Sequence, residues 1–339
     1  MRGLYKPEKP NFASADSKRQ TRFTWNSLHG RLILFLVTLV FTLLAAKLEL
    51  PHSLRGALPE EVLKAALKAR ATMEAAIDVI KNAKTESGIP IMPGSRGLIG
   101  DEYNVLTTTL GNLSAKRSAE NPEWAEALVR ELWRFGLKRG DVLAVGMSGS
   151  FPGLNIALIS AAQALGLDVL AVSSVTASSY GANQEGFTWP ELELHLVKAG
   201  IISRTSLGIS LGGSDDSGID LQPEGRELAE RIASECSAAL GARLLGKGGF
   251  SQSVEERLDL YKEAARGRRI SLYVNIGGTQ ASMGEGSAVL ELSSGFIEAR
   301  AFDLGRNRGV MARMMEEGVP VLSLLNIREL GFKWGITVD

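Results

Sequence analysis

The chain has 339 residues, and its 38 basic and 38 acidic side chains give a formal net charge of zero. This balance argues against a general nucleic-acid binder, which is ordinarily basic, so no nucleic-acid partner is expected. The single cysteine, Cys236, excludes an intramolecular disulfide and any metal site built from several cysteines.

The N-terminal part predicts a membrane anchor. Residues 1–30 are polar, basic and without periodicity, which indicates a disordered cytoplasmic tail. Residues 31–50 include an uncharged apolar run, Leu32–Ala46, and are long enough to span a lipid bilayer. The basic excess before this run places the N-terminus in the cytoplasm and the main domain outside it, as a single-pass cell-membrane protein. A cleaved signal peptide is the alternative, although the small-x-small cleavage pattern is missing.

The segment after the anchor predicts helices and loops. Residues 51–90 are expected to form a linker and a long helix that begins after Pro59, either as a stalk or packed into the domain. Residues 91–339 are expected to form an extracytoplasmic α/β domain. Within it, Thr107–Asn112 is dense in polar residues and suits a binding loop, although turn and cap duties explain such residues equally well. Asn121 and Pro122 predict the start of a helix that runs to Phe135.

The stretch Gly140–Asn155 predicts the centre of the fold. An apolar run rich in β-branched residues indicates a buried strand, and a Gly/Ser loop, a helix to Leu165 and a second strand at 168–172 follow. This is one βαβ unit with parallel strands. We expect Ser150 or Phe151 to precede the first helical turn, with Ser150 as the better cap, and Pro152 to occupy that turn. Three glycines of the loop should let an anion approach the helix N-terminus, namely Gly146, Gly149 and Gly153. A plain βα turn is the alternative.

The rest of the chain continues to alternate strands with helices. The patterns predict helices at 189–199, 224–240, 254–265 and 310–317, and strands at 206–211, 270–276 and 320–326. This alternation predicts an α/β fold: a mostly parallel doubly wound sheet, here preceded by a single N-terminal transmembrane helix.

Candidate ligand-binding residues follow from the expected topology, because ligands bind outside the carboxyl ends of parallel strands. Four small-residue loops are expected to meet there, around Ser148/Ser150, Ser178/Asn183, Gly213/Asp215 and Gly277/Thr279. The candidates are Glu102, Thr108, Gly149, Asn155, Asn183, Gly213, Asp215, Asn275, Gly277 and Gly278. Four basic side chains would suit a polyanion if they lie near this cleft, namely Lys116, Arg117, Arg204 and Arg300.

Four segments carry a resemblance to a known family. Leu98–Tyr103, Thr107–Leu113, Gly146–Pro152 and Val274–Gly278 resemble the poly-γ-glutamate system protein family of bacteria, over roughly residues 90–325. The resemblance implies an accessory role in making or exporting a poly-γ-glutamate capsule. Its implied partners are the other membrane proteins of that system and the anionic γ-glutamate polymer. It implies no catalytic residues.

A serine in the central loop is the candidate nucleophile of an alternative, enzymatic function. Gly146–Ser150 nearly matches the G-x-S-x-G nucleophile elbow, which makes Ser148 and Ser150 the candidates for a γ-glutamyl amide hydrolase or transferase. An ordinary triad is disfavoured, because His195, the one histidine distant from the anchor, falls in the middle of a predicted helix. A Ser–Lys or Ser–carboxylate arrangement stays open.

Neither a metal nor a cofactor is expected. Asp215, Asp216 and Asp220 could hold Mg²⁺ or Ca²⁺, but neighbouring side chains in an extended loop point apart, and an Asp-rich turn before a helix is the plainer interpretation. The sequence also lacks a zinc motif and a Walker phosphate loop.

Overall fold

The computed structural model describes residues 32–40, 58–285, 292, 294–299 and 308–339. The chain divides into two units, Met1–Gly56 and Ala57–Asp339. In the first, residues 32–40 form a helix with exposed apolar side chains. The expected tail at 1–30 lies outside the described residues, and so does the remainder of the expected anchor at 31–50. Of the helices in the described ranges, none is long and apolar enough to cross a membrane.

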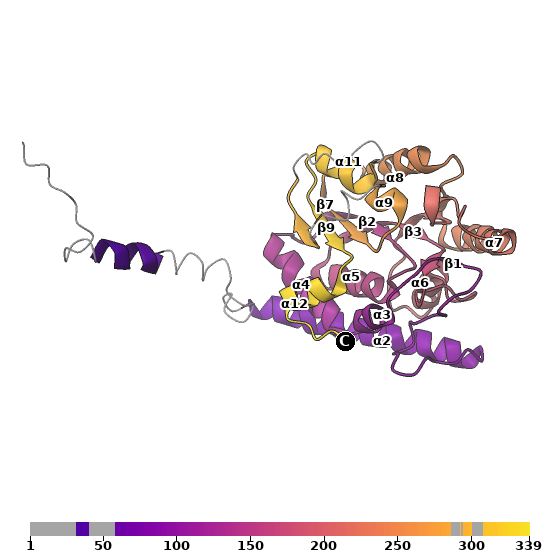
Figure 1. Ribbon diagram of the computed structural model, residues 1–339, viewed down its shortest axis with the longest axis horizontal. Coiled ribbons are helices and arrows are strands. Elements are labelled where there is room, and N and C mark those ends of the chain that lie inside the picture. Colours follow the sequence, from indigo (N-terminus) through magenta and orange to yellow (C-terminus); the bar gives the residue numbers. More distant parts are fainter. Residues whose placement is uncertain (1–31, 41–57, 286–291, 293, 300–307) are drawn as a thin grey trace, which may run out of the picture. The chain divides into compact units, whose positions relative to one another are not determined.

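A seven-stranded sheet forms the centre of the second unit (Figure 1). Its strands lie in the order β6-β5-β3-β2-β7-β9-β8, and neighbouring strands are parallel except for β8, which is antiparallel to β9. A small parallel sheet pairs β1 with β4. These findings confirm the predicted α/β fold with a mostly parallel sheet. The strands are β1 (Thr107–Thr109), β2 (Val142–Met147), β3 (Asp168–Ser174), β4 (Ala177–Ser178), β5 (Ser206–Ser210), β6 (Arg243–Leu244), β7 (Ile270–Ile276), β8 (Gly295–Ile297) and β9 (Val321–Leu324).

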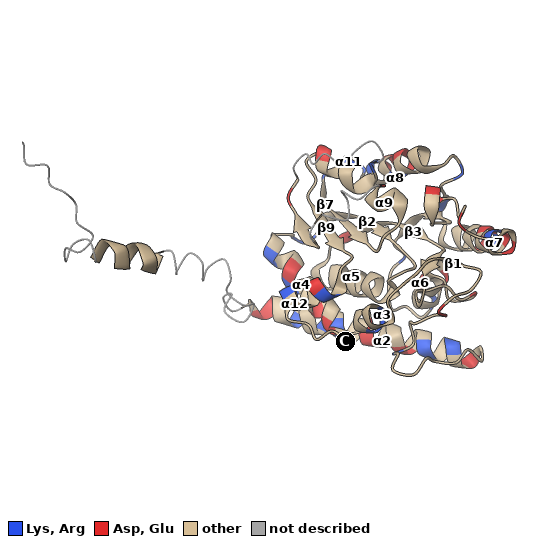
Figure 2. Cartoon of the chain, viewed as in Figure 1, with Lys and Arg blue, Asp and Glu red and all other residues tan. Residues whose placement is uncertain are grey.

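Helices cover both faces of the sheet. One core holds α2 (Glu60–Glu86), α4 (Glu123–Phe135), α5 (Pro152–Leu165), α6 (Trp189–Lys198) and α12 (Ile327–Trp334) against one face. A second core holds α8 (Phe250–Ala265), α9 (Gln280–Met283) and α11 (Val310–Glu316) against the other. A third packs α7 (Pro223–Leu240), with Cys236 buried in it, near β5. Figure 2 shows the charged residues on the helices, whereas β2, β7 and β9 carry none. Because α2 is packed in the first core, it is not a free stalk.

The helical connections on the two sides of β2 lie on opposite faces of the sheet, so the topology switches at β2. The chain passes from β2 to β3 through α5 on one face and reaches β7 through α8 on the other. β3 and β7 are the two neighbours of β2. The connections therefore diverge at the carboxyl ends of β2 and β7, which is where open α/β sheets bind ligands.

The start of α5 differs from the prediction in its cap. Pro152 does occupy the first turn, but the residue at the N-cap is Phe151, and no side chain caps the helix there. The Ser150 hydroxyl instead accepts a hydrogen bond from the backbone N–H of Ser178, at 3.0 Å. The prediction that Ser150 is the better cap was wrong, because the N–H of Ser178 in β4 engages its hydroxyl.

The glycines of this loop make room for protein atoms. A Cβ at Gly153 would overlap the carbonyl oxygen of Ala119, and one at Gly149 would lie 2.8 Å from the carbonyl oxygen of Thr176. Gly146 is crowded in the same way by side chains of β7 and α9. The loop glycines therefore allow a close approach to the backbone, as the sequence indicates, but the atoms that approach belong to the protein itself and not to an anion.

A buried ion pair holds the loop that follows β5. Asp216 and Arg257 are 0% and 3% exposed, and Nη2 of Arg257 lies 2.5 Å from Oδ2 of Asp216. Ser210 donates a further hydrogen bond to Asp216, and Ser253 another. Asp215 and Asp216 both have left-handed backbone angles, with φ of 57° and 56°. That conformation costs about 1–2 kcal/mol per residue, so the buried contacts must hold it in place.

Loss of this pair should destabilise the whole unit. Arg257→Met leaves Asp216 buried without its cation, and we expect the free energy of unfolding in urea to fall by about 3–5 kcal/mol. The control is Arg243→Ala. It breaks the ion pair between Arg243 and Glu263, two side chains that are about half exposed. It should lower the free energy of unfolding by less than about 1 kcal/mol. Equal losses in the two variants would contradict the assigned role of the Asp216–Arg257 pair.

Candidate functional site

A cleft of about 710 Å³ opens at the carboxyl ends of the sheet strands. All four loops expected to meet there contribute to its lining, and so does the segment around β1. The start of α12 supplies the last part of the wall. The lining residues that matter below are Thr108, Lys116, Ser148, Ser150, Phe151, Ser178, Gly213, Asp220, Gly278, Glu285 and Arg328.

The structure brings some of the candidate residues to this cleft. Thr108, Ser148, Ser150, Gly213 and Gly278 line it. Gly149 and Gly277 lie beside lining residues in the chain but do not line the cleft themselves.

The three candidate asparagines do not reach the cleft, because they hold loop backbone in place. Asn155 donates to the carbonyl of Ser148 at 2.9 Å, and Asn275 donates to the carbonyl of Gly277 at 2.9 Å. Asn183 accepts from the N–H of Asp101 and donates to its carbonyl, each at 2.9 Å. All three are fully buried. Unpaired backbone groups in a buried loop are costly, so these side chains shape the wall from behind.

The carboxylates proposed from the sequence also have other partners. Oδ1 of Asp215 accepts from the N–H of Phe250, the first residue of α8, at 2.6 Å. Asp220 accepts from the N–H of Ser214 at 2.5 Å, while Asp216 pairs with Arg257. The three carboxylates are thus engaged separately. Glu102 is exposed and lies outside the cleft lining.

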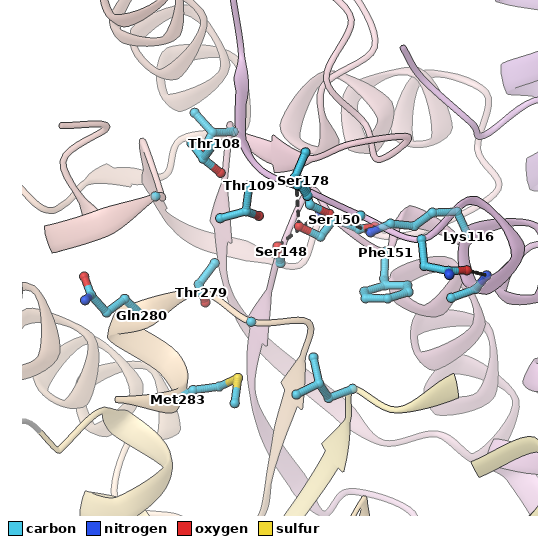
Figure 3. A pocket seen from close by; sticks show the side chains of 18 of the residues that line it. Thr108, Thr109, Lys116, Ser148, Ser150, Phe151, Ser178, Thr279, Gln280 and Met283 are labelled. Carbon is cyan, nitrogen blue, oxygen red and sulfur yellow. Dashed lines mark hydrogen bonds between the residues drawn. The ribbon is translucent and has the colours of Figure 1, made fainter. Parts of the chain in front are cut away.

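Three serine hydroxyls follow one another along one wall of the cleft (Figure 3). Oγ of Ser148 accepts from the N–H of Ser150 at 3.1 Å, and Oγ of Ser150 accepts from the N–H of Ser178 at 3.0 Å. Oγ of Ser178 accepts from the amine of Lys116 at 2.8 Å. Each hydroxyl therefore accepts one hydrogen bond, and in the described part of the chain none of the three hydroxyl hydrogens has an acceptor. Each is free to donate to a ligand.

Lys116 has an unusual environment for a lysine. The side chain is 4% exposed, and its amine donates to the carbonyl of Ser150 and to the hydroxyl of Ser178. Its Nζ also lies 3.8 Å from the centre of the Phe151 ring. It forms no ion pair with any carboxylate in the described part of the chain. Burial lowers the pKa of Lys116 to about 7, from its ordinary value of 10.5, because water is removed from the cation.

The position of Lys116 follows from a short helix that the sequence patterns did not predict. Asn112 caps α3 (Leu113–Ala119) by accepting from the N–H of Ala115 at 3.0 Å. Residues of α3 pack against α5 and α12, which turns Lys116 inward. The available signal was Asn112, a good N-cap after a loop, but seven residues are too few to show a helical period.

The other candidate bases and cations lie elsewhere. Arg117 donates to the carbonyl of Pro93 and Arg204 to that of Leu240, and Arg300 lies outside the described residues. Nε2 of His195 lies 3.1 Å from the carbonyl oxygen of Gly186, and its ring stacks on Phe187. Because His195 does not line the cleft, it cannot serve Ser148 or Ser150 as a base.

Charges of both signs line the cleft. The cations Lys116 and Arg328 belong to α3 and α12, which pack together. The carboxylates Asp220 and Glu285 flank η2 (Ser214–Asp216) and α9, which also pack together. A ligand that carries both carboxylate and ammonium groups would find a partner for each.

Comparison of the sequence with models of known protein families, with curated proteins and with solved structures finds no match.

The lowered pKa of Lys116 predicts how stability changes with pH. Between about pH 7 and pH 10.5 the unfolded chain holds a proton on this amine that the folded chain does not. The free energy of unfolding should therefore rise with pH across this window, and more steeply for the wild type than for Lys116→Met. Urea titrations at several pH values measure the difference. Curves that stay parallel would show that the amine is not desolvated.

Proposed function

We propose that the cleft binds a γ-linked glutamate chain, and that the protein is a membrane-anchored accessory component of a bacterial poly-γ-glutamate system. One observation carries the ligand class. Lys116 is a buried amine at the cleft wall that is about half protonated at pH 7, and its protonated form has no carboxylate among the described residues to neutralise it. Burying an unpaired cation is unfavourable, so an anionic ligand that reaches it gains an interaction the free protein lacks.

The serine wall supports a carboxylate in particular. Ser148, Ser150 and Ser178 present hydroxyl donors next to the amine of Lys116. Hydrogen bonds between such donors and an ionised oxygen are stronger than neutral ones. The four segments that resemble the poly-γ-glutamate family point to the same chemistry, since three of them contribute residues to the cleft.

The mixed charge of the cleft suits one end of such a chain. The amino-terminal residue of a γ-linked chain carries a free ammonium and a free carboxylate on the same carbon. Lys116 and Arg328 match the carboxylates of the ligand, and Asp220 and Glu285 match the ammonium.

Binding is favoured over hydrolysis through Ser148 or Ser150. A serine nucleophile needs a base within hydrogen-bonding distance. The hydroxyl contacts of Ser148 and Ser150 in the described structure are backbone N–H groups, which cannot take a proton.

Titration calorimetry with oligo-γ-glutamate tests the proposal. We expect Lys116→Met to weaken binding about 10- to 100-fold, because a charged hydrogen bond contributes about 1.5–3 kcal/mol. Affinity should fall as the pH rises through about 7, since only the protonated amine attracts a carboxylate. Wild-type protein that binds no oligo-γ-glutamate at low salt would contradict the ligand class.

Two controls make the result specific. Lys84→Met also removes a buried lysine, one that donates to the carbonyl of Ile99 at 2.9 Å and does not line the cleft, so its affinity should match the wild type. An α-linked oligoglutamate of equal length has the same net charge at neutral pH but a different backbone. Equal affinity for both polymers would argue against recognition of the γ-linkage.

The accessory role includes anchoring through residues 31–50. Support comes from the uncharged run Leu32–Ala46, the basic excess before it and the exposed apolar side chains of residues 32–40. An isolated helix that is apolar on all sides is unstable in water and stable in lipid.

Reporter fusions test the anchor. A phosphatase that works only outside the cytoplasm, fused after Ala57, should be active, and a fluorescent reporter that matures only in the cytoplasm should stay dark. Replacing Leu36 and Leu39 with Arg should release the protein from the membrane fraction, because charged residues disfavour insertion. A bright cytoplasmic reporter would refute this topology.

A further inference from the structure

The contact between Lys116 and Ser178 has the geometry of a base and its nucleophile. Nζ of Lys116 lies 2.8 Å from Oγ of Ser178, and both residues line the cleft. Lys116 comes from α3 and Ser178 from β4, so the contact joins two elements 62 residues apart. The Ser178 N–H donates to Ser150, which fixes the backbone that carries the hydroxyl.

The surroundings of Lys116 favour proton transfer. The groups that face its amine are the Ser178 hydroxyl, the Ser150 carbonyl and the Phe151 ring. Two charged residues lie close to Lys116 in the sequence. Arg117, on the same helix, donates to the carbonyl of Pro93. Glu120, which follows the helix, accepts from the N–H groups of Arg96 and Leu98. The other charged lining residues of the cleft are Asp220, Glu285 and Arg328.

Without a nearby carboxylate, burial alone sets the protonation of Lys116. It lowers the pKa to about 7, so a large fraction of the amine is neutral at neutral pH and able to accept a proton.

Lys84 is a second buried lysine whose pKa is also lowered by burial, but its amine does not contact a hydroxyl group. It is 3% exposed, lies 5.6 Å from the Phe187 ring centre and has a pKa lowered to about 8, but its amine donates to a backbone carbonyl. A second buried lysine therefore exists in this chain with similar burial and no hydroxyl partner.

We propose that Ser178 and Lys116 form a nucleophile–base pair that cleaves or transfers γ-glutamyl amide bonds in the cleft. This inference rests on the proposed ligand class and adds a reaction to it. It places the nucleophile on β4, at a serine other than the two suggested by the elbow-like motif.

The reaction proceeds in two balanced halves. Oγ of Ser178 attacks the carbonyl carbon of the amide while its proton passes to the neutral amine of Lys116. The C–N bond then breaks, and Lys116 returns the proton to the departing amine, which leaves a γ-glutamyl ester on Ser178. Water attacks this ester as Lys116 takes its proton, the bond from carbon to Oγ breaks, and the proton passes to Oγ. An amine in place of water gives transfer.

Covalent labelling tests the pair without assuming a substrate. The full chain is treated with a fluorophosphonate, which reacts with activated serines, and the modified residue is identified by peptide mass spectrometry. We expect labelling at Ser178, its loss in Ser178→Ala, and at least about a hundredfold slower labelling in Lys116→Met, the scale of a lost general base. Lys84→Met should label like the wild type, and so should Ser234→Ala, which changes an exposed serine of α7.

The pH dependence separates a catalytic base from a structural contact. Labelling should accelerate as the pH rises through about 7, because the neutral amine is the base, whereas oligo-γ-glutamate binding should weaken over the same range. Thermal unfolding of each variant confirms that it is folded, and Ser178→Cys keeps a nucleophile next to Lys116 if Ser178→Ala does not fold. No labelling of Ser178 in folded wild-type protein, or labelling unaffected by Lys116→Met, would overturn the pair.

Incubation with oligo-γ-glutamate then tests the reaction. Shorter chains with the wild type, and unchanged chains with Ser178→Ala, would support it. Binding without labelling or cleavage would refute the pair and leave the proposed function standing. Labelling of Ser178 without binding of the oligomer would refute the proposed ligand instead.

Discussion

Backbone groups at the carboxyl ends of the parallel strands are the main constraint on this structure. Beyond the last ladder residues of β2 and β7, backbone carbonyls enter buried loops where they have no strand partner, and leaving them unpaired is costly. Buried side chains replace those partners. Asn155 donates to the carbonyl of Ser148, which follows β2, and Asn275 donates to the carbonyl of Gly277, which follows β7. These contacts fix the backbone of two loops that line the cleft.

The same constraint explains which roles the sequence could not reveal. An asparagine that binds a ligand and one that hydrogen-bonds to loop backbone both occur near the carboxyl end of a strand and use the same amide group. The sequence alone cannot tell them apart. The patterns for β2, β3, β5, β7 and β9 were predictable because these strands are four to seven residues long and mostly buried, which gives a clear signal. By contrast, β1, β4, β6 and β8 have only two or three residues and owe their pairing to the surrounding structure.

Lys116 shows a different reason for failure. A lysine on a short helix is expected at the surface, because burying its charge is unfavourable. Its burial arises from packing of α3 against α5 and α12, and its neighbour Ser178 lies 62 residues away. Parallel topology did predict the edge of the sheet where the cleft lies, and it would also have predicted the loop after β9, which lines the cleft as well.

The support of α3 has a consequence for the order of assembly during synthesis. Residues late in the chain hold this helix: the N–H of Asp339 donates to Ser118 at 2.9 Å, and the Arg328 guanidinium donates to Ser114 at 3.4 Å. A ribosome delivers Lys116 and Ser178 long before it delivers residues 326–339. A nascent chain therefore holds both cleft residues while the last wall of the cleft is still missing, so the finished cleft must be among the latest features to form.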